Sequence, residues 1–313
     1  MRYIFSIIIA WLSGVFSIVE AAVPSASAVV ALASDVVGLP SAVVGLPSDV
    51  TYTKADSITI CRLLNEAPPN AGTLWFAQHF IGVPYVAHTL EVNDTEKLVV
   101  NTRQLDCTTF VETVTALKMC VDRRLCRWTD FLAMLTKLRY RGGVIAGYAS
   151  RLHYFSDWII DNGESLHLVT DIQMPRPPFS AIQTLSINFM STHVQSYKAL
   201  KADGRLVPLI RLQEKKLTGR KWRYIPKAQT ANAKLLSTCV RDGDIIAITT
   251  KKKGLDIAHL GFAAWHDGQL HLLNASSIHK CVVDEPMTLH DYLSKHPSFT
   301  GVKIIRINPP QKK

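Results

Sequence analysis

The chain reads HLGFAAWHDGQLHLLNASS from His259 to Ser277, and this stretch carries the clearest hairpin signal in the sequence. Asp267 and Gly268 form a two-residue turn of the kind that joins antiparallel strands. Strand-forming residues flank the turn on both sides, which predicts strands over Leu260–His266 and Gln269–Ala275. The stretch therefore predicts an antiparallel sheet in the C-terminal half.

The turn also determines which residues face each other across this hairpin. If His266 faces Gln269, counting back from the turn places Gly261 opposite Asn274. His259 is then a diagonal neighbour of Asn274, about 7–8 Å away at the backbone. At that separation an asparagine carbonyl can accept a hydrogen bond from an imidazole N–H, so we expect these two side chains to meet.

Helices precede the strands along the chain, an order typical of an α+β domain. Apolar residues recur at three- and four-residue steps in the best of these helices, which places them on one face. The predicted helices are Ser57–Glu66, Thr73–Phe80, Asp106–Asp122 and Trp128–Tyr140, and the further strands are Asp244–Thr250 and Val302–Ile307. The segment from Pro175 to Pro178 is predicted to be a loop.

A cysteine stands at the head of the Asp106–Asp122 helix. Asp106 is a good N-cap residue, so Cys107 occupies the first helical position, where free N–H groups favour a thiolate. That effect is worth only about 0.3–1 kcal/mol, so a working nucleophile also needs a histidine partner. The alternative is a buried core cysteine, the usual environment of a free thiol.

Cys107, His259 and Asn274 together supply a nucleophile, a general base and a residue that fixes the tautomer of the base. Gly261 and Ala263 share a strand face with His259, and their small side chains predict that the Cys107 helix packs closely on that face. The alternative is an ordinary strand histidine and an asparagine that bonds to its own backbone.

The N-terminal segment predicts export. Met1 and Arg2 precede an apolar stretch from Tyr3 to Val19, and small residues flank a cleavage position near Ala21. Residues 1–21 are therefore predicted to be a signal peptide. In this interpretation the mature protein lies outside the cytoplasm, in the periplasm. The alternative is an uncleaved membrane anchor, because the apolar run approaches the ~20 residues that span a bilayer.

Low complexity separates this segment from the folded part. Residues 22–50 are mostly Ala, Val, Ser, Gly and Pro, and VVGLPS occurs at Val36–Ser41 and again at Val43–Ser48. We interpret residues 22–50 as a linker and residues 51–313 as one folded domain.

The formal net charge of +10 over 313 residues favours an anionic partner. The longest basic run is only Lys251–Lys253, which argues against nucleic acid. No histidine spacing predicts a zinc site. Six cysteines in an oxidising compartment permit disulfides, for which Cys120 with Cys126, or Cys239 with Cys281, are possible pairs.

Four features of the sequence resemble those of the NlpC-type, papain-like cell-wall cysteine peptidases. The stretch Leu105–Glu112 resembles their Asp-Cys-x-x-Phe-Val signature, and His259–Phe262 resembles their His-Val-Gly-Ile strand. Asn274 aligns with their third catalytic position, and Gly82–Tyr85 resembles their Gly-x-Pro-Tyr motif. The resemblance implies a papain-like fold, with the nucleophile at the start of a helix that packs on an antiparallel sheet.

A narrower resemblance points to one branch of this superfamily. Thr108 and Thr109 after the cysteine, Thr89–Glu91 and Arg151–Phe155 are similar to the AmiA-like branch. Its members are N-acetylmuramoyl-L-alanine amidases that act on 1,6-anhydro-muropeptides in cell-wall recycling. The resemblance implies an exported hydrolase that needs no cofactor, binds muropeptides, and does not insert in a membrane once its signal peptide is removed.

By the same resemblance, the Cys107 thiolate attacks the lactyl carbonyl of muramic acid and His259 protonates the leaving amine, with Asn274 as the third catalytic residue. The backbone N–H of Cys107 is then a candidate oxyanion donor. The candidate substrate-binding residues are Tyr85, Glu91, Arg151, His153, Tyr154, Trp158 and Asp256. In one interpretation Arg151 binds a carboxylate and Tyr154 and Trp158 stack on sugars. The alternative is an ordinary solvated segment with two core aromatic residues.

Two other functions remain compatible with the sequence. A γ-D-glutamyl-diaminopimelate endopeptidase uses the same thiol chemistry but cuts within the stem peptide. A wall-binding module would keep the fold without turnover, although an intact Cys107, His259 and Asn274 set argues against it.

Overall fold

The computed structural model describes residues 50–310, which belong to one compact unit, Val43–Lys313. The predicted signal peptide and nearly all of the predicted linker lie outside the described residues. The first described residues, Val50–Thr51, form strand β1, which pairs in parallel with β2 (Leu98–Val99).

Helices dominate the first part of the described chain, as predicted. They are α2 (Lys54–Glu66), α3 (Thr73–Gln78), α4 (Cys107–Asp122), α5 (Trp128–Arg139) and α6 (Phe155–Ile159), with the short 3-10 helices η1 (Arg141–Gly143) and η2 (Tyr148–Ser150) and the π-helix η3 (Ile160–Ser165). The start of α2 precedes the predicted Ser57 because Thr53 forms a capping box with Asp56.

An eight-stranded sheet forms the second part, and all of its strand pairs are antiparallel. Its order is β4-β5-β10-β6-β7-β8-β9, and β3 also pairs with β10. The strands are β3 (Val169–Ile172), β4 (Ala181–Thr184), β5 (Lys221–Pro226), β6 (Ile245–Thr250), β7 (Ile257–His266), β8 (Gln269–Ser276), β9 (Cys281–Asp284) and β10 (Phe299–Ile307). The structure therefore confirms the α+β class.

The sequence did not predict β3, β4, β5, β9 or the elements interspersed among the strands. These are α7 (Phe189–Thr192), η4 (Val194–Ser196), α8 (Lys198–Ala202), α9 (Leu206–Leu217), η5 (Lys227–Ala231), α10 (Ala233–Leu236) and α11 (Leu289–Ser294). The helices α7–α9 contribute to a separate apolar cluster that includes Met190, Leu200 and Ile210.

The β7–β8 hairpin has the predicted register. His266 pairs with Gln269, and the ladder continues without a break to Phe262 and Leu273. Asp267 and Gly268 have φ values of 48° and 74°, the left-handed backbone that a tight two-residue hairpin turn requires. A register shift does occur on the other side of β7, where it pairs with β6 next to His259.

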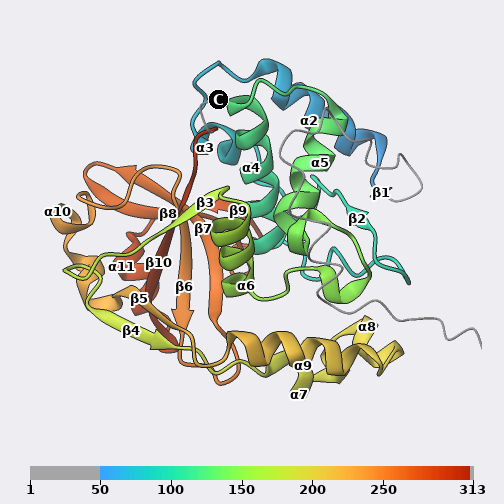
Figure 1. The fold of residues 1–313 in the computed structure, drawn as a ribbon. Coiled ribbons are helices and arrows are strands. Elements are labelled where there is room, and N and C mark those ends of the chain that lie inside the picture. Colours follow the sequence, from blue (N-terminus) through green and yellow to red (C-terminus); the bar gives the residue numbers. More distant parts are fainter. Residues whose placement is uncertain (1–49, 311–313) are drawn as a thin grey trace, which may run out of the picture. The chain divides into compact units, whose positions relative to one another are not determined.

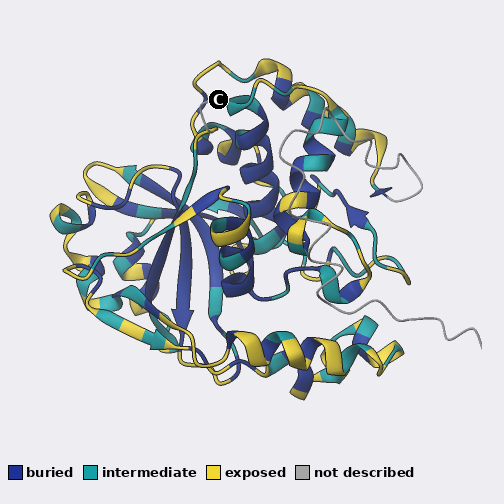
Figure 2. Ribbon diagram, in the orientation of Figure 1, coloured by how far each residue is buried: buried dark blue, intermediate teal, exposed yellow. Residues whose placement is uncertain are grey.

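Helices cover both faces of the central sheet (Figure 1). Leu260, Phe262 and Ala264 of β7 belong to the core cluster that contains the apolar residues of α2–α5. Ala263 belongs to the opposite cluster, with residues of α10 and α11. Figure 2 shows the central strands as buried, and because successive residues of a strand point to opposite faces, both faces are covered.

This arrangement corrects the predicted packing of the Cys107 helix. Phe110 of α4 packs edge-on against Phe262, with ring centroids 5.5 Å apart, so α4 covers the Phe262 face of β7. Ala263 points to the other face, and Gly261 faces the neighbouring strand, where a Cβ would lie 2.9 Å from Asn274 Cβ. A Cβ at 261 would also lie 2.8 Å from Leu272 Cδ1 and from the Leu273 carbonyl oxygen, so the small residue accommodates β8 rather than α4.

Neither possible disulfide is formed, since all six cysteines are free. Cys120 is buried in the helical core, whereas Cys126 is exposed beyond the end of α4. Within residues 50–310, no helix is long and apolar enough to span a membrane.

Candidate active site

The first turn of α4 holds Cys107 in a defined position. The Asp106 carboxylate accepts a hydrogen bond from the Thr109 N–H at 2.8 Å, and the Thr109 hydroxyl accepts one from the Asp106 N–H at 2.9 Å. This reciprocal pair is a capping box, with threonine in the place usually taken by glutamate or glutamine. The second threonine after the cysteine therefore has a structural role, which is to fix the helix start.

Burial controls the ionisation of Cys107 more strongly than the helix does. Burial, together with the neighbouring Asp106 carboxylate, raises the pKa of the thiol to about 12. Hydrogen bonds from the Leu260 backbone and from Thr108 act in the opposite direction but do not outweigh burial. The helix start therefore favours the thiolate too weakly to outweigh burial, in line with the expectation that a working nucleophile here needs a histidine partner.

The hairpin holds the His259 ring in one orientation. Its Nε2 lies 2.8 Å from Asn274 Oδ1, the contact that the hairpin register predicts. Because Oδ1 can only accept, Nε2 carries the proton and Nδ1 is left with a lone pair. Burial lowers the pKa of His259, and the hydrogen bond to Asn274 only partly offsets this. The imidazole is therefore neutral at neutral pH.

Cys107 and His259 line one pocket of about 210 Å³. Of the candidate substrate-binding residues, the pocket lining includes His153, Tyr154, Trp158 and Asp256. Met190, Tyr197 and Leu255 complete much of the wall. No Lys or Arg lines the pocket within the described part of the chain.

The predicted roles of Tyr154 and Trp158 in sugar stacking need correction. Tyr154 is 4% exposed, and its hydroxyl donates to Glu214 at 2.8 Å and accepts from the Met190 N–H at 2.9 Å. Trp158 is 1% exposed and stacks on Phe155 at a centroid distance of 4.9 Å. Both rings build the pocket wall and leave little face for a sugar.

His153 and Asp256 are also held by the protein itself. The Nε2 of His153 lies 2.9 Å from the Tyr148 carbonyl oxygen, and burial lowers the pKa of His153 to about 3. Asp256 accepts hydrogen bonds from the Ser156 N–H at 2.6 Å and the Ile257 N–H at 2.8 Å, which fixes the start of α6 beside β7. Both side chains therefore stabilise the pocket.

Arg151 lies outside the pocket, which corrects its predicted role in binding a substrate carboxylate. It is 5% exposed and pairs with Glu91 at 2.5 Å and with Glu96 at 3.5 Å. Tyr140 donates to Glu96 at 2.8 Å from the other side. Glu91 is likewise engaged with Arg151 and does not line the pocket.

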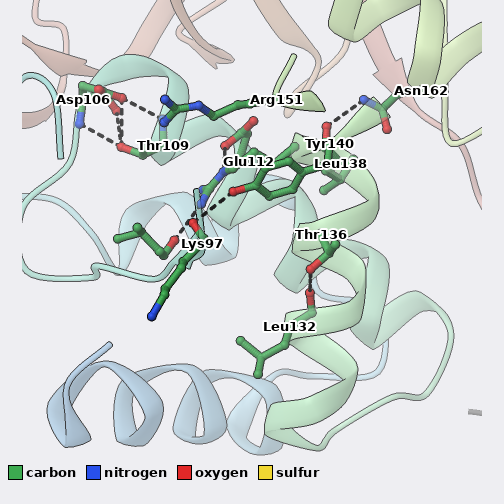
Figure 3. A network of polar contacts seen from close by, with 12 residues as sticks. Lys97, Asp106, Thr109, Glu112, Leu132, Thr136, Leu138, Tyr140, Arg151 and Asn162 are labelled. Atoms are coloured by element: carbon green, nitrogen blue, oxygen red, sulfur yellow. Dashed lines mark hydrogen bonds and ion pairs between the residues drawn. The ribbon is translucent and has the colours of Figure 1, made fainter. Parts of the chain in front are cut away.

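A second buried ion pair involves Glu112 of α4, which Figure 3 labels together with Tyr140 and Arg151. Arg139, at the end of α5, donates to Glu112 of α4 at 2.6 Å and to the Val99 carbonyl at 2.6 Å. Both charged side chains are at most 3% exposed. The pair therefore joins the Cys107 helix to α5 and β2.

Tyr85 lies close to Cys107 without lining the pocket. Burial raises the pKa of its hydroxyl to about 12, and charge on Cys107 and Asp106 contributes in the same direction. Its backbone N–H donates to the Lys280 carbonyl at 2.8 Å, which joins the Gly82–Tyr85 segment to the start of β9.

Sequence reasoning missed Met190 and Tyr197 in the pocket wall and Glu285 behind Asn274. The first two come from the segment between β4 and β5, which carries no recognisable motif. Glu285 follows β9, and only the pairing of β8 with β9 brings it near Asn274. Within residues 50–310, no group of three or more His, Cys, Asp or Glu could hold a metal ion.

Residues 75–302 match the family model described as AmiA-like, N-acetylmuramoyl-L-alanine amidase-like. The structure resembles an N-acetylmuramoyl-L-alanine amidase from Bacteroides uniformis at 40% identity, covering 77% of this chain and 99% of that one, with a TM-score of 0.71. A protein from Bacteroides fragilis named as a candidate xylanase is 41% identical, covering 74% and 99% of the two chains, with a TM-score of 0.69.

A more distant structure, a protein from Legionella pneumophila, is 25% identical and covers 81% of this chain and 94% of that one, with a TM-score of 0.60. No curated protein sequence matches the chain.

Proposed function

The chain belongs to the AmiA-like, N-acetylmuramoyl-L-alanine amidase-like family, and from this we propose that Cys107, His259 and Asn274 hydrolyse the muramoyl-alanine amide of peptidoglycan fragments. One observation carries the proposal: the His259–Asn274 contact of 2.8 Å orients an imidazole in the pocket that Cys107 also lines. This arrangement suits acyl transfer through a thioester.

The neutral resting pair defines the order of proton transfers. Cys107 Sγ attacks the lactyl carbonyl carbon while its proton passes to His259 Nδ1. The backbone N–H of Cys107 has no carbonyl partner within the helix, so it is available to stabilise the oxyanion. His259 then returns the proton to the nitrogen of L-alanine, and the C–N bond breaks. Water, deprotonated by His259, hydrolyses the thioester and regenerates the thiol.

The pocket supports an amidase over a glycosidase. Glycosidases use two carboxylates that flank the scissile bond. The pocket lining within residues 50–310 has one carboxylate, Asp256, whose two oxygens each accept a backbone N–H. The xylanase name attached to the Bacteroides fragilis relative therefore has no counterpart in this pocket.

We extend the proposal to 1,6-anhydro-muropeptides as substrates, because the Thr108-Thr109 variant of the cysteine motif resembles that branch. The test is incubation of the protein with defined anhydro-muropeptides and with the same fragments carrying a reduced muramic acid, followed by mass analysis of the products. Free disaccharide with an intact stem peptide supports the amidase. Cleavage within the stem peptide supports the endopeptidase instead, and no cleavage by folded protein contradicts both.

Two variants sharpen this experiment. Cys107→Ala is expected to lose hydrolysis by about three orders of magnitude or more, because it removes the nucleophile. Cys126→Ala is the matched control, since Cys126 is free and exposed beyond the end of α4. Equal activity in the two variants would contradict the assignment of Cys107.

We also propose that the enzyme acts outside the cytoplasm, with residues 1–21 as its export signal. Fractionation of cells expressing the full chain, followed by N-terminal sequencing, tests this. A mature protein that begins near Ala22 in the periplasmic fraction supports export. An intact N-terminus in the membrane fraction supports an anchor instead.

A further inference from the structure

A buried carboxylate stands directly behind Asn274. The Asn274 Nδ2 donates to Glu285 Oε1 at 3.3 Å and to the Leu272 carbonyl at 3.4 Å. The Glu285 side chain is 1% exposed, and its Oε2 lies 3.2 Å from His279 Nε2. Hydrogen bonds therefore connect His259, Asn274, Glu285 and His279 in one series, from the pocket to the surface.

The backbone holds Glu285 firmly against β8. Its N–H donates to the Leu272 carbonyl at 3.0 Å, and its own carbonyl lies 3.0 Å from His271 Nδ1. Both contacts are with β8, the strand that carries Asn274. The carboxylate is thus held by the same strand as the amide that it contacts, so little freedom is left between them.

This contact determines which way the Asn274 amide faces. A carboxylate accepts hydrogen bonds and an amide nitrogen donates them, so Glu285 draws the Nδ2 side of Asn274 toward itself. The Oδ1 side then faces His259, and the proton must be on Nε2. If the amide turned over, its NH₂ group would require the opposite tautomer, with the proton on Nδ1, and Nδ1 could not accept the proton of Cys107.

We propose that Glu285 is a positioning residue of the active site, which fixes the Asn274 amide and through it the His259 tautomer that can deprotonate Cys107. The inference rests on the proposed roles of Cys107, His259 and Asn274. Glu285 acts only through Asn274 and contacts neither the substrate nor the sulfur.

The negative charge of Glu285 favours His259 as a base, as its contact with Asn274 does. Burial lowers the pKa of His259, whereas Asn274 and the negative charge of Glu285 raise it. Two other groups that affect His259 are His296, which lowers its pKa, and Asp106, which raises it. The Tyr292 ring of α11 also lies beside the imidazole, at a centroid distance of 6.4 Å. Glu285 therefore also makes His259 a stronger base.

The test compares two substitutions at 285 with a control on the adjacent residue. Glu285→Gln keeps an acceptor for Asn274 but removes the charge, whereas Glu285→Ala removes both. Asp284→Asn makes the same carboxylate-to-amide change at the residue before it, whose carboxylate contacts His266 at 2.9 Å. Thermal unfolding of each variant identifies any loss that comes from misfolding.

We expect Glu285→Ala to lower kcat by about tenfold to a hundredfold, by analogy with the loss on removing an outer partner that orients a metal-bound histidine. Glu285→Gln is expected to restore part of this loss and to shift the acid limb of the pH–rate profile to lower pH, because the pKa of His259 falls. Asp284→Asn is expected to leave kcat and the limb unchanged.

A readout without substrate separates this proposal from the proposed function. The ¹⁵N resonances of the His259 ring report which nitrogen carries the proton. They are expected to show the Nε2–H tautomer in the wild type and a shift toward Nδ1–H in Glu285→Ala. If wild-type protein cleaves no muropeptide but the tautomer changes, the positioning role stands and the substrate assignment fails. An unchanged tautomer in folded Glu285→Ala, or a wild-type kcat, overturns the positioning role.

Discussion

Replacing Arg139 with methionine tests whether the buried ion pair stabilises the position of the Cys107 helix. The substitution leaves the Glu112 carboxylate of α4 buried without its partner and removes the donor to the Val99 carbonyl. Both side chains of the pair are almost fully buried, so water cannot readily replace the missing guanidinium.

The magnitude follows from this burial. Breaking a buried pair by removing one partner costs about 3–5 kcal/mol, because an uncompensated charge remains. For a chain of this size, 1 kcal/mol shifts Tm by about 2–4 °C. We therefore expect Arg139→Met to lower Tm by about 6–20 °C. The double variant Glu112→Leu with Arg139→Met removes both charges and should recover most of that loss.

The loss of stability in Arg139→Met should also depend on pH. Burial raises the pKa of Glu112, and Arg139 partly offsets that rise, so removing Arg139 raises the pKa further. A carboxyl whose pKa is raised in the folded state binds more protons folded than unfolded, so its penalty grows as pH rises above the unfolded value of about 4.3. The deficit should therefore be smaller at pH 5 than at pH 8.

Calorimetry or urea unfolding of the wild type and the single and double variants at both pH values measures this. A double variant no more stable than Arg139→Met would show that lost packing, rather than the unpaired charge, causes the effect. A single variant within 1 kcal/mol of wild type would refute the role of the pair altogether.

Three further predictions concern the site and the sheet. The acid limb of kcat/KM should lie below 6.5, the ordinary histidine pKa, because burial lowers the pKa of His259; a limb above 6.5 contradicts a buried neutral base. Gly261→Ala should lower the free energy of unfolding by about 1–3 kcal/mol and lower kcat, because its Cβ would lie 2.8 Å from the Leu273 carbonyl oxygen. The control Gly204→Ala has open space around it and should change neither quantity. Burial lowers the pKa of Lys303 to about 8, so the folded state binds fewer protons and the free energy of unfolding should rise from pH 8 to 10. Urea unfolding of Lys303→Met should show no such rise. If the free energy of unfolding rose equally with pH in the wild type and in Lys303→Met, the role of Lys303 would be contradicted.

The amino-acid sequence alone predicts the parts of the site whose geometry is local. The start of α4 depends on Asp106 and the residues directly after it, so a capping motif is enough to predict it. The contact between His259 and Asn274 follows from a two-residue turn, because a short hairpin connection leaves one register and side chains alternate along each strand. These two features predicted the candidate nucleophile and its partner histidine before any tertiary contact was known.

Only the tertiary structure decided what lies around them. Leu260–Ala264 is buried on both faces, so alternation could not show which face α4 covers, and the expectation based on Gly261 was wrong. Arg151 carries a charge that predicts an exposed binding group, yet Glu91 and Glu96 compensate it in the interior. The pocket residue Met190 and the carboxylate of Glu285 reach the site through contacts between segments far apart in the chain. Such contacts depend on packing of the whole fold, whereas turns, caps and strand register depend on a few neighbouring residues.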